Sequence, residues 1–413
     1  MQETIRLGPD RRGQLLVTAG DRVGYFGPEP GPPTAQTDRR IECAQGVIRP
    51  GWINAHTHIY SGLAPLGMPQ PQTKPENFTQ ILEQVWWRLD RALDEDSLRA
   101  AARYYVAESL TAGTTMLIDH HESPNFIEGS LEILADACQE LGMRALICYG
   151  ATERNQGRDE ARKGLGECRR FIESNRRPLV HGLVGLHASF TVSDETIREA
   201  GELCRELDCK LHVHMAEDGC DVRDAQARGY AGPLERLIEL EALPPGSLMA
   251  HGVHLDRSQV ERAARRGLWF LQNPRSNRGN EVGYPAALAA SKLVALGTDG
   301  YPSNRLEEAE ALNEEATRHG DDLDATDARL TGAYDLASNF FDGSFTPLTV
   351  GGWADAVVET ANGISHLVTG GRLVIDNGAL ATGDLDRIRA AAASEAKRLW
   401  DRMRSVGDSK ETV

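Results

Sequence analysis

The sequence predicts an α/β protein: a (β/α)₈ TIM barrel with a small β-sandwich domain built from both termini. Eight short apolar runs alternate with amphipathic segments from residue 47 onward, which is the pattern of a closed parallel barrel. Short alternating runs separated by Gly, Pro and Asp turns occupy both ends of the chain. A Gly-rich dinucleotide fingerprint is absent from the sequence, which argues against an open doubly wound sheet.

Eight apolar runs are the expected barrel strands. They are Val47 to Asn54, Thr115 to Asp119, Ala145 to Tyr149, Leu183 to His187, Leu211 to Met215, Leu248 to His251, Leu268 to Gln272 and Leu293 to Thr298. Helical patterns lie between them: Ser193 is placed to cap a helix that reaches Leu207, and Asp256 with Gln259 resembles a capping box for residues 257–266. Strand and helix therefore alternate along the whole central region.

We divide the chain into three parts on these patterns. Residues 1–46 and 344–383 are expected to form one composite β-domain, residues 47–343 the barrel, and residues 384–413 a C-terminal helix and tail. The helix is expected over about Leu385 to Arg404, where apolar residues recur at helical spacing.

Composition limits the partners of this protein. The 413 residues are 40% hydrophobic, and 45 Lys and Arg against 61 Asp and Glu give a net charge of −16 without a basic cluster. Nucleic acid and anionic membranes need a positive surface, so we expect a small-molecule ligand and neither of these partners. Seven cysteines without a Cys-x-x-Cys pair, and no leader or long apolar run, predict a cytoplasmic protein with reduced thiols.

Histidines follow the first strand. His56 and His58 are two residues apart, and such side chains on a strand point to the same side, so both imidazoles can reach one ion about 2.0–2.1 Å away. A pair of surface histidines in a loop would explain this motif alone equally well.

Three other strand ends carry residues of the same kind. Alternation places His212 and His214 on one face, and Glu217 lies just beyond that strand, where a carboxylate could shuttle protons for an activated water. His251 and Asp299 end two later strands. Each has an ordinary explanation: a buried histidine, a helix-capping glutamate or an Asp-Gly turn. The residues at these four strand ends would meet at one open end of the barrel only if the predicted fold is correct.

These motifs resemble the metal-dependent amidohydrolase superfamily, in its aminohydrolase and chlorohydrolase (ATZ/TRZ-like) branch. The matching segments are 50–58 (PGWINAHTH), 214–217 (HMAE), 250–255 (AHGVHL) and 297–300 (GTDG). Within the branch the sequence is most similar to the SsnA-like aminohydrolases, through residues 86–95 (WWRLDRALDE), 118–121 (IDHH) and 275–277 (RSN). The resemblance spans nearly the whole chain.

The resemblance implies one divalent ion bound by four residues, which are His56, His58, His214 and Asp299. Glu217 would move protons to the leaving nitrogen, His251 would polarise the substrate or orient the water, and Asp299 could take a proton from the water. Three imidazoles and a carboxylate suit zinc, iron or manganese, of which we expect zinc. The family also leads us to expect a homodimer. None of the six lysines ends the fourth strand, so a carbamate bridging two metals is not expected.

Six residues are candidate substrate contacts. His187 ends the fourth strand and matches a substrate-contacting position of related deaminases. Trp87 lies off the apolar helical stripe that includes Trp86, so it could present its ring to a heterocycle or simply pack in the loop. The others are Glu153 and Arg154 after the third strand, His121 after the second, and Arg275 after the seventh. Each of these four has an alternative: surface exposure for Glu153 and Arg154, the neighbouring His120 in place of His121, and a purely local turn contact for Arg275.

The sequence and its resemblance thus predict an aminohydrolase that removes an amino group from a purine- or pterin-like heterocycle by metal-activated hydroxide. Two alternatives stay open at this point. The same site could open the ring of a cyclic amide, or the barrel could be a non-catalytic protein that keeps a metal for stability.

Overall fold

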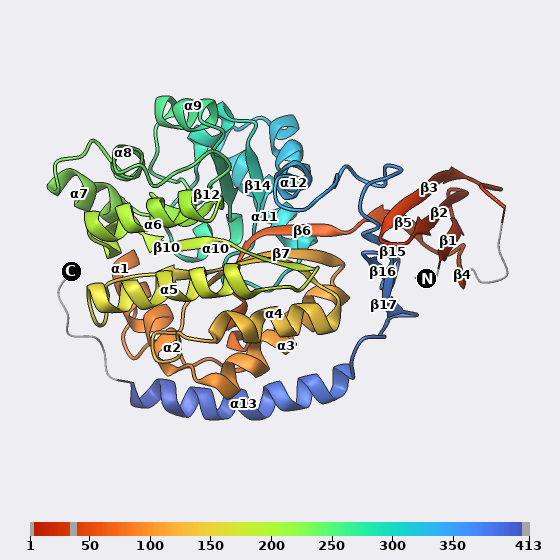
Figure 1. Cartoon of the computed structure of the whole chain (residues 1–413), viewed down its shortest axis with the longest axis horizontal. Coiled ribbons are helices and arrows are strands. Elements are labelled where there is room, and N and C mark those ends of the chain that lie inside the picture. The colour runs from red at the N-terminus through yellow and green to blue at the C-terminus, as the bar shows by residue number, and fades with distance from the viewer. Residues whose placement is uncertain (1–3, 34–38, 407–413) are drawn as a thin grey trace.

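The computed structural model describes residues 4–33 and 39–406 of the chain. Within these residues, a nearly closed barrel of eight parallel strands with helices between them forms the centre of the molecule (Figure 1). The strands follow the chain in spatial order: β6 (Trp52–Thr57), β7 (Thr114–His121), β8 (Arg144–Ala151), β10 (Val184–Ala188), β11 (Leu211–Met215), β12 (Leu248–His251), β13 (Trp269–Gln272) and β14 (Val294–Leu296). A short strand, β9 (Val180–Gly182), also pairs with β8. The predicted barrel is confirmed.

The first and last strands meet just beyond β14. Thr57 forms a parallel bridge with Asp299, and the carbonyl of His56 accepts hydrogen bonds from the amides of Thr298 (2.8 Å) and Asp299 (2.9 Å). Since these bonds join the two strand ends that carry predicted metal ligands, barrel closure itself brings those ligands together.

The predicted first strand, residues 47–54, is two strands in the structure. β5 (Val47–Pro50) pairs with β15 in a different sheet, and the barrel strand β6 begins only at Trp52. The change of sheet occurs at Gly51, where a Cβ would lie 2.2 Å from the Cγ2 of Thr115. A side chain would not fit at this junction, which an apolar pattern alone cannot reveal.

Helices surround the barrel and extend its carboxyl end. Those that follow the strands in turn are α3 (Glu95–Thr111), α4 (Ser130–Leu141), α5 (Arg158–Ser174), α6 (Asp194–Glu206), α7 (Gly219–Ala227), α8 (Pro233–Glu239), α9 (Arg257–Arg265), α10 (Pro274–Gly279), α11 (Arg305–His319) and α12 (Leu323–Ala337). The long segment after β6 holds α1 (Phe78–Ile81), a π-helical turn (Leu82–Trp86) and α2 (Trp87–Ala92). Single 3₁₀ turns occur at Ile59–Ser61, Ala64–Leu66, Ser189–Thr191 and Ala286–Ala290.

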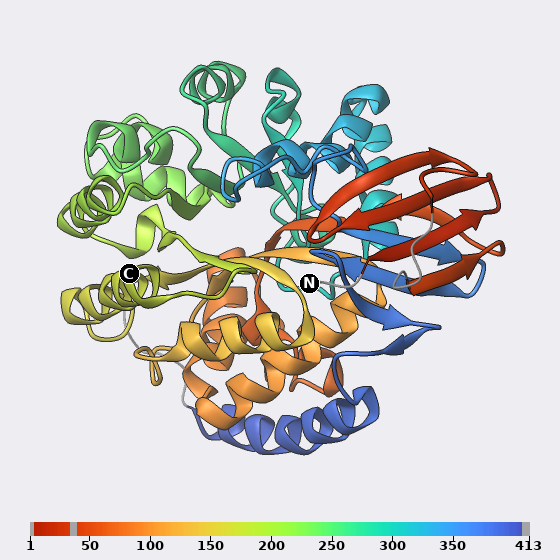
Figure 2. The same ribbon diagram turned by 45° about the vertical axis from the view of Figure 1, so that its right-hand side comes forward.

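Strands from both ends of the chain build a small β-domain beside the barrel (Figure 2). One sheet has the order β3 (Arg22–Pro28), β2 (Gln14–Ala19), β1 (Ile5–Asp10), β4 (Arg39–Cys43). The other has the order β18 (Ala379–Leu380), β17 (Arg372–Asp376), β16 (Gly363–Thr369), β15 (Ala356–Thr360), β5. Apolar residues of both sheets, such as Leu7, Leu16 and Val358, share one buried core. The predicted two-ended β-domain is therefore present.

The C-terminal helix α13 (Leu385–Ser405) runs along the outside of the barrel against α3 and α2 (Figure 1). Its buried side, with Ile388, Leu399 and Trp400, joins the main apolar core. The predicted tail beyond residue 406 lies outside the described residues. Among the helices of the described part of the chain, none is long and apolar enough to cross a membrane.

Candidate active site

Four side chains from the first, fifth and eighth strand ends meet at the carboxyl end of the barrel. Nε2 of His58 lies 2.8 Å from Oδ1 of Asp299, and Nε2 of His56 lies 3.3 Å from the same oxygen. Nε2 of His214 lies 3.2 Å from Nε2 of His58. Three imidazole nitrogens and one carboxylate oxygen thus point at one small volume.

Each of the three histidines is oriented by its other ring nitrogen. Nδ1 of His58 donates to the carbonyl of His120 (2.6 Å), and Nδ1 of His214 donates to the carbonyl of His187 (2.7 Å). Nδ1 of His56 lies 3.0 Å from Nε2 of the deeper residue His212. Such bonds fix the tautomer that leaves Nε2 free to bind a metal.

The donor atoms at this point fit a divalent cation. Nε2 of His56 is buried and has no hydrogen-bond partner among the described residues, which is costly unless an ion is bound there. Burial lowers the pKa of His56 to about 4 and that of His214 well below its usual value, so both are neutral, as metal ligands must be. Burial also acts to lower the pKa of His58, but the adjacent carboxylate of Asp299 outweighs it and raises that pKa to about 9, so His58 would lose a proton when a cation binds. Burial alone would raise the pKa of Asp299, but the neighbouring imidazoles of His56 and His58, whose Nε2 atoms lie 3.3 Å and 2.8 Å from Oδ1, hold it well below its ordinary value.

Two overlapping groups of side chains have ligand atoms within 4.8 Å of one another. One contains His56, His214, His251 and Asp299, and the other contains His58, His120 and His214. The four predicted ligands are spread over both groups, and His214 belongs to each. His251 and His120 border the same volume, so either could lie beside the ion.

Glu217 stands where a proton shuttle would be needed. Its side chain is 12% exposed, Oε2 lies 3.5 Å from Nε2 of His251, and Oε1 accepts a hydrogen bond from the side-chain amide of Asn280 (3.2 Å). Burial raises the pKa of Glu217 to about 7, although His251 opposes the shift. A carboxyl group with such a pKa can both accept and release protons near neutrality.

Hydrogen bonds from α10 and the residue after it connect these groups. The side chain of Asn280 also donates to the hydroxyl of Ser276 (3.3 Å), and that hydroxyl donates to Oδ2 of Asp299. Nδ1 of His251 donates to the amide oxygen of Asn277 (2.8 Å), which leaves Nε2 of His251 directed at Glu217. One short helix therefore orients Glu217, His251 and Asp299 together.

The backbone is strained at three of these strand ends. Ala216, His251 and Asp299 adopt left-handed conformations with φ of 47°, 74° and 54°. Such conformations cost a non-glycine residue on the order of 1 kcal/mol or more, and they cluster at functional sites.

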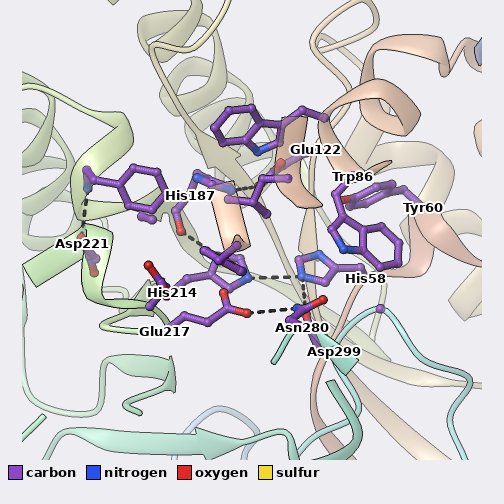
Figure 3. Close-up of a pocket in the computed structure, with 17 residues that line it drawn as sticks. His58, Tyr60, Trp86, Glu122, His187, His214, Glu217, Asp221, Asn280 and Asp299 are labelled. Carbon is purple, nitrogen blue, oxygen red and sulfur yellow. Dashed lines mark hydrogen bonds and ion pairs between the residues drawn. The ribbon is translucent and has the colours of Figure 1, made fainter. Parts of the chain in front are cut away.

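A cavity opens directly above the cluster (Figure 3). It is lined by His58, Tyr60, Phe78, Leu82, Trp86, Trp87, Glu122, His187, Ala188, Phe190, His214, Glu217, Asp218, Asp221, Asn280, Asp299 and Gly300. Seven aromatic or apolar side chains share this lining with nine polar or charged ones, so the cavity offers both an apolar surface and convergent polar groups to a small organic ligand.

Two of the six predicted substrate contacts line this cavity. His187 and Trp87 both belong to the lining, with ring centroids 6.2 Å apart. Trp86, which its helical spacing assigned to packing, lines the cavity as well. The π-helical turn that ends at Trp86 lies just before Trp87, so the wider turn coincides with the stretch that faces the ligand space.

Arg154 is buried beneath the lining and is not part of it. Its Nη2 donates to Oδ2 of Asp90 (2.9 Å) and Oε2 of Glu122 (2.8 Å), and its guanidinium carbon lies 4.6 Å from the centre of the Trp87 ring. Arg154 therefore fixes two lining residues, Trp87 and Glu122, and acts on a ligand only through them.

The other three predicted contacts, Glu153, Arg275 and His121, are not among the lining residues and bind other parts of the protein. Glu153 accepts hydrogen bonds from the amide and hydroxyl of Ser193, and so helps to cap α6. The guanidinium of Arg275 binds Glu307, Glu308 and the carbonyl of Pro302, and Arg275 is not among the residues that line the cavity, so it does not make the predicted substrate contact there. His121 is buried against the hydroxyl of Ser123 (2.8 Å).

His120, rather than His121, faces the metal cluster. Its ring centroid lies 4.6 Å from that of His214. Gly150 on β8 makes room for it, because a Cβ there would lie 2.3 Å from Cε1 of His120. Strand alternation requires that only one of the two histidines points inward, but it does not say which.

Two polar residues of the site, Glu122 and Asn280, were not identified from the sequence, and Ser276 was noted only as part of the matching segment 275–277. Glu122 follows the end of β7 directly, so its place after a barrel strand is a usable signal. Ser276 and Asn280 are four residues apart at the start and just after the end of α10, a spacing that places them on one helix face.

The fold and these motifs were compared with known proteins. Residues 47–337 of the chain match the amidohydrolase family. A 5'-deoxyadenosine deaminase of Methanoregula boonei is 31% identical over 274 residues, which cover 64% of this chain and 58% of that relative, so the chain matches less than two thirds of its length. An 8-oxoguanine deaminase of Pseudomonas aeruginosa is 27% identical over 337 residues, covering 76% of this chain and 74% of the relative.

A solved structure shares the whole fold. The adenosine deaminase from Xanthomonas campestris, determined with bound zinc, aligns with a TM-score of 0.78 and 22% identity over 98% of each chain. The family match covers most of the barrel, including every residue of the His and Asp cluster. The chain belongs to the amidohydrolase family.

Proposed function

We propose that this protein is a metal-dependent aminohydrolase that hydrolyses a C–N bond of a purine- or pterin-like heterocycle and releases ammonia. The observation that carries the proposal is the convergence of His56, His58, His214 and Asp299 beneath a cavity that Glu217 also lines. The deaminase names of the relatives support the reaction class, and the aromatic lining supports a planar ligand.

We assign the metal to His56, His58, His214 and Asp299, with zinc as the expected ion in view of the zinc-bound solved relative. A divalent cation held by these residues supplies Lewis acidity and makes a water acidic enough to react near neutral pH. His251, with Nε2 free of hydrogen bonds within the described part of the chain, is left to orient the water or the substrate.

Glu217 performs the proton transfers. The water oxygen forms a bond to the amino-bearing ring carbon, and one water proton passes to a carboxylate oxygen of Glu217. Glu217 then protonates the amino nitrogen, the C–N bond breaks, and ammonia leaves with the bonding electron pair. Asn280 holds Oε1 of Glu217, and the neighbouring His251 lies on the Oε2 side, so the carboxyl group stays directed into the cavity.

Release of ammonia from a panel of aminated purines, pterins, triazines and pyrimidines, with metal analysis of the same preparation, tests this proposal. At least one substrate should yield one ammonia per turnover, and the metal content should be one ion per chain. A product whose ring has opened without ammonia release would instead identify a cyclic amide hydrolase. Absence of turnover over the whole panel by a fully metal-loaded enzyme would contradict the proposed reaction.

A further inference from the structure

Glu122 offers an unused acceptor in the cavity, away from the catalytic carboxylates. It follows the end of β7, it is 3% exposed, and in Figure 3 it lies toward the upper edge of the lining while Glu217 and Asp299 lie toward the lower edge. Its Oε1 has no hydrogen-bond partner among the described residues and lies 3.6 Å from Nε2 of His187. The catalytic scheme above does not use this oxygen.

His187 presents a lone pair to Glu122. The hydroxyl of Thr191 donates its single proton to the carbonyl of Ala188 (3.0 Å), so it can only accept from Nδ1 of His187 (3.0 Å). The proton of the neutral ring is therefore on Nδ1, and Nε2 is an acceptor.

His120 presents a second lone pair to the same oxygen, Oε1 of Glu122. Its Nε2 donates to the carbonyl of Leu186 (3.1 Å), and its Nδ1, which is buried without a hydrogen-bond partner within the described ranges, lies 3.7 Å from Oε1 of Glu122. Neither histidine therefore gives a proton to Glu122.

Arg154 keeps Glu122 in place and partly offsets the burial that raises the pKa of the Glu122 carboxyl group to about 7. Nη2 of Arg154 donates to Oε2 of Glu122, and the same nitrogen binds Asp90. Two carboxylates share this one guanidinium, so the buried trio carries excess negative charge when both are ionised. When Glu122 is ionised, Oε1 of Glu122 and Nε2 of His187, 3.6 Å apart, form a pair of acceptors at the edge of the cavity with no proton between them.

We propose that Glu122 and His187 together bind a nitrogen donor of the substrate, an amino group on an edge of the heterocycle other than the one that is hydrolysed. This inference rests on the proposed function and narrows its substrate class to diamino heterocycles and similar rings. A ligand that lacks this donor would leave two buried acceptors unpaired and desolvated, which is how a polar site rejects near-isosteric ligands.

Binding of matched ligands to the metal-loaded enzyme, measured in a time that is short compared with turnover, tests the inference by a readout other than the reaction rate. The pairs differ by one amino group: adenine and 2,6-diaminopurine, purine and 2-aminopurine, and 4-aminopyrimidine and 2,4-diaminopyrimidine. Dissociation constants should favour the amino-bearing member of at least one pair by about tenfold or more, the effect expected of a hydrogen bond to a charged group. Because the readout is a ratio within one variant, a general loss of affinity cancels.

Glu122→Gln is the sharpest variant. Arg154 will hold the amide oxygen at the position of Oε2, so the amide NH₂ will take the place of Oε1 and donate to His187. This substitution turns an acceptor into a donor, so the preference for the amino-bearing ligand of a pair should fall to about threefold or less. Glu122→Ala removes the acceptor and should abolish this preference as well. Glu167→Gln is the control: Glu167 is also a buried glutamate bound to an arginine, Arg170, but it lies on α5 outside the cavity lining, and the preference should persist.

Four results would overturn the inference. The wild-type enzyme could bind both members of every pair equally, or bind none of them, or Glu122→Gln could retain the wild-type preference. A second metal ion per chain that disappears in Glu122→Ala would show that Glu122 binds a cation instead. Failure of the ammonia assay with intact pair discrimination would count against the proposed reaction alone, so the two proposals fail separately.

Discussion

Nε2 of His58, at the end of the first barrel strand, lies 2.8 Å from Oδ1 of Asp299, just beyond the eighth. The backbone repeats this relationship, because the amide of His58 donates to the carbonyl of Asp299 (3.3 Å). Closure of the barrel therefore also brings two of the proposed metal ligands together. A substitution of either residue should therefore lower metal binding more than it lowers the stability of the fold.

Asp299→Asn should remove the metal. The amide is a poorer ligand than the carboxylate, and the histidine cluster then lacks the negative charge that offsets a divalent ion. We expect metal content well below one ion per chain and a loss of turnover of about 10³-fold or more. Metal analysis after dialysis, together with the rate, measures both. His366→Asn is the control, since His366 is a buried histidine of the β-domain, bound to Ser365 and remote from the cluster. Full metal content in Asp299→Asn would contradict the assignment.

Glu217→Gln should separate chemistry from metal binding. Glu217 belongs to neither group of metal-competent residues, so the metal content should stay at the wild-type level. Without a carboxylate to carry the proton, kcat should fall by about 10²-fold or more, in line with the usual contribution of general acid–base catalysis. Single-turnover rates on the metal-loaded variant would measure this. An unchanged rate would remove Glu217 from the mechanism.

The activity should decrease in acid because of the same residue. Burial raises the pKa of Glu217 to about 7, and only the ionised carboxylate can accept the proton of the attacking water. The value of kcat/KM should therefore fall as the pH drops below about 7, by about tenfold per pH unit. The hydrogen bond from Asn280 lowers this pKa, so Asn280→Ala should move the acid limb to higher pH. A profile recorded from pH 5 to 9 with both proteins tests the sign, and a shift toward acid in the variant would disprove it.

Much of the fold follows from local patterns. Ser193 does cap α6, with its hydroxyl accepting from the amide of Thr196, and Asp256 with Gln259 does form a capping box at the start of α9. Caps and strand periodicity depend on neighbours within a few residues, which is why a single sequence reveals them. The order of the eight strands then brought the ends of the first, fifth, sixth and eighth to one mouth, as a barrel requires.

The residues that contact the substrate were harder to predict, because their orientation depends on contacts between segments that are distant in the sequence. Glu153 and Arg154 are adjacent in sequence, yet Glu153 turns to the start of α6 and Arg154 turns under the cavity to Asp90. Arg275 begins a helix whose partner, Glu308, comes from α11. In each case the choice is made by an oppositely charged or hydrogen-bonding partner far along the chain, which periodicity does not encode.

Arg144 lies at the opposite end of the barrel from the cavity, at the start of β8. It is 1% exposed, and its Nε and Nη2 donate to Oδ2 (2.7 Å) and Oδ1 (3.3 Å) of Asp355, which leads into the β-domain strand β15. Its guanidinium carbon also lies 3.9 Å from the centre of the Trp353 ring. The pair therefore joins the β-domain to the barrel in a buried setting.

Arg144→Met should destabilise the protein by about 3–5 kcal/mol, since it leaves the buried Asp355 carboxylate without its cation. Denaturant titration measures this loss, and kcat of the folded fraction should be unchanged because Arg144 lies far from the cavity. Arg257→Met, which breaks the exposed pair of Arg257 with Glu261 on α9, is the matched control and should leave the midpoint almost unmoved. If both variants unfolded at the wild-type denaturant concentration, the contact between Arg144 and Asp355 would not contribute to holding the two parts together.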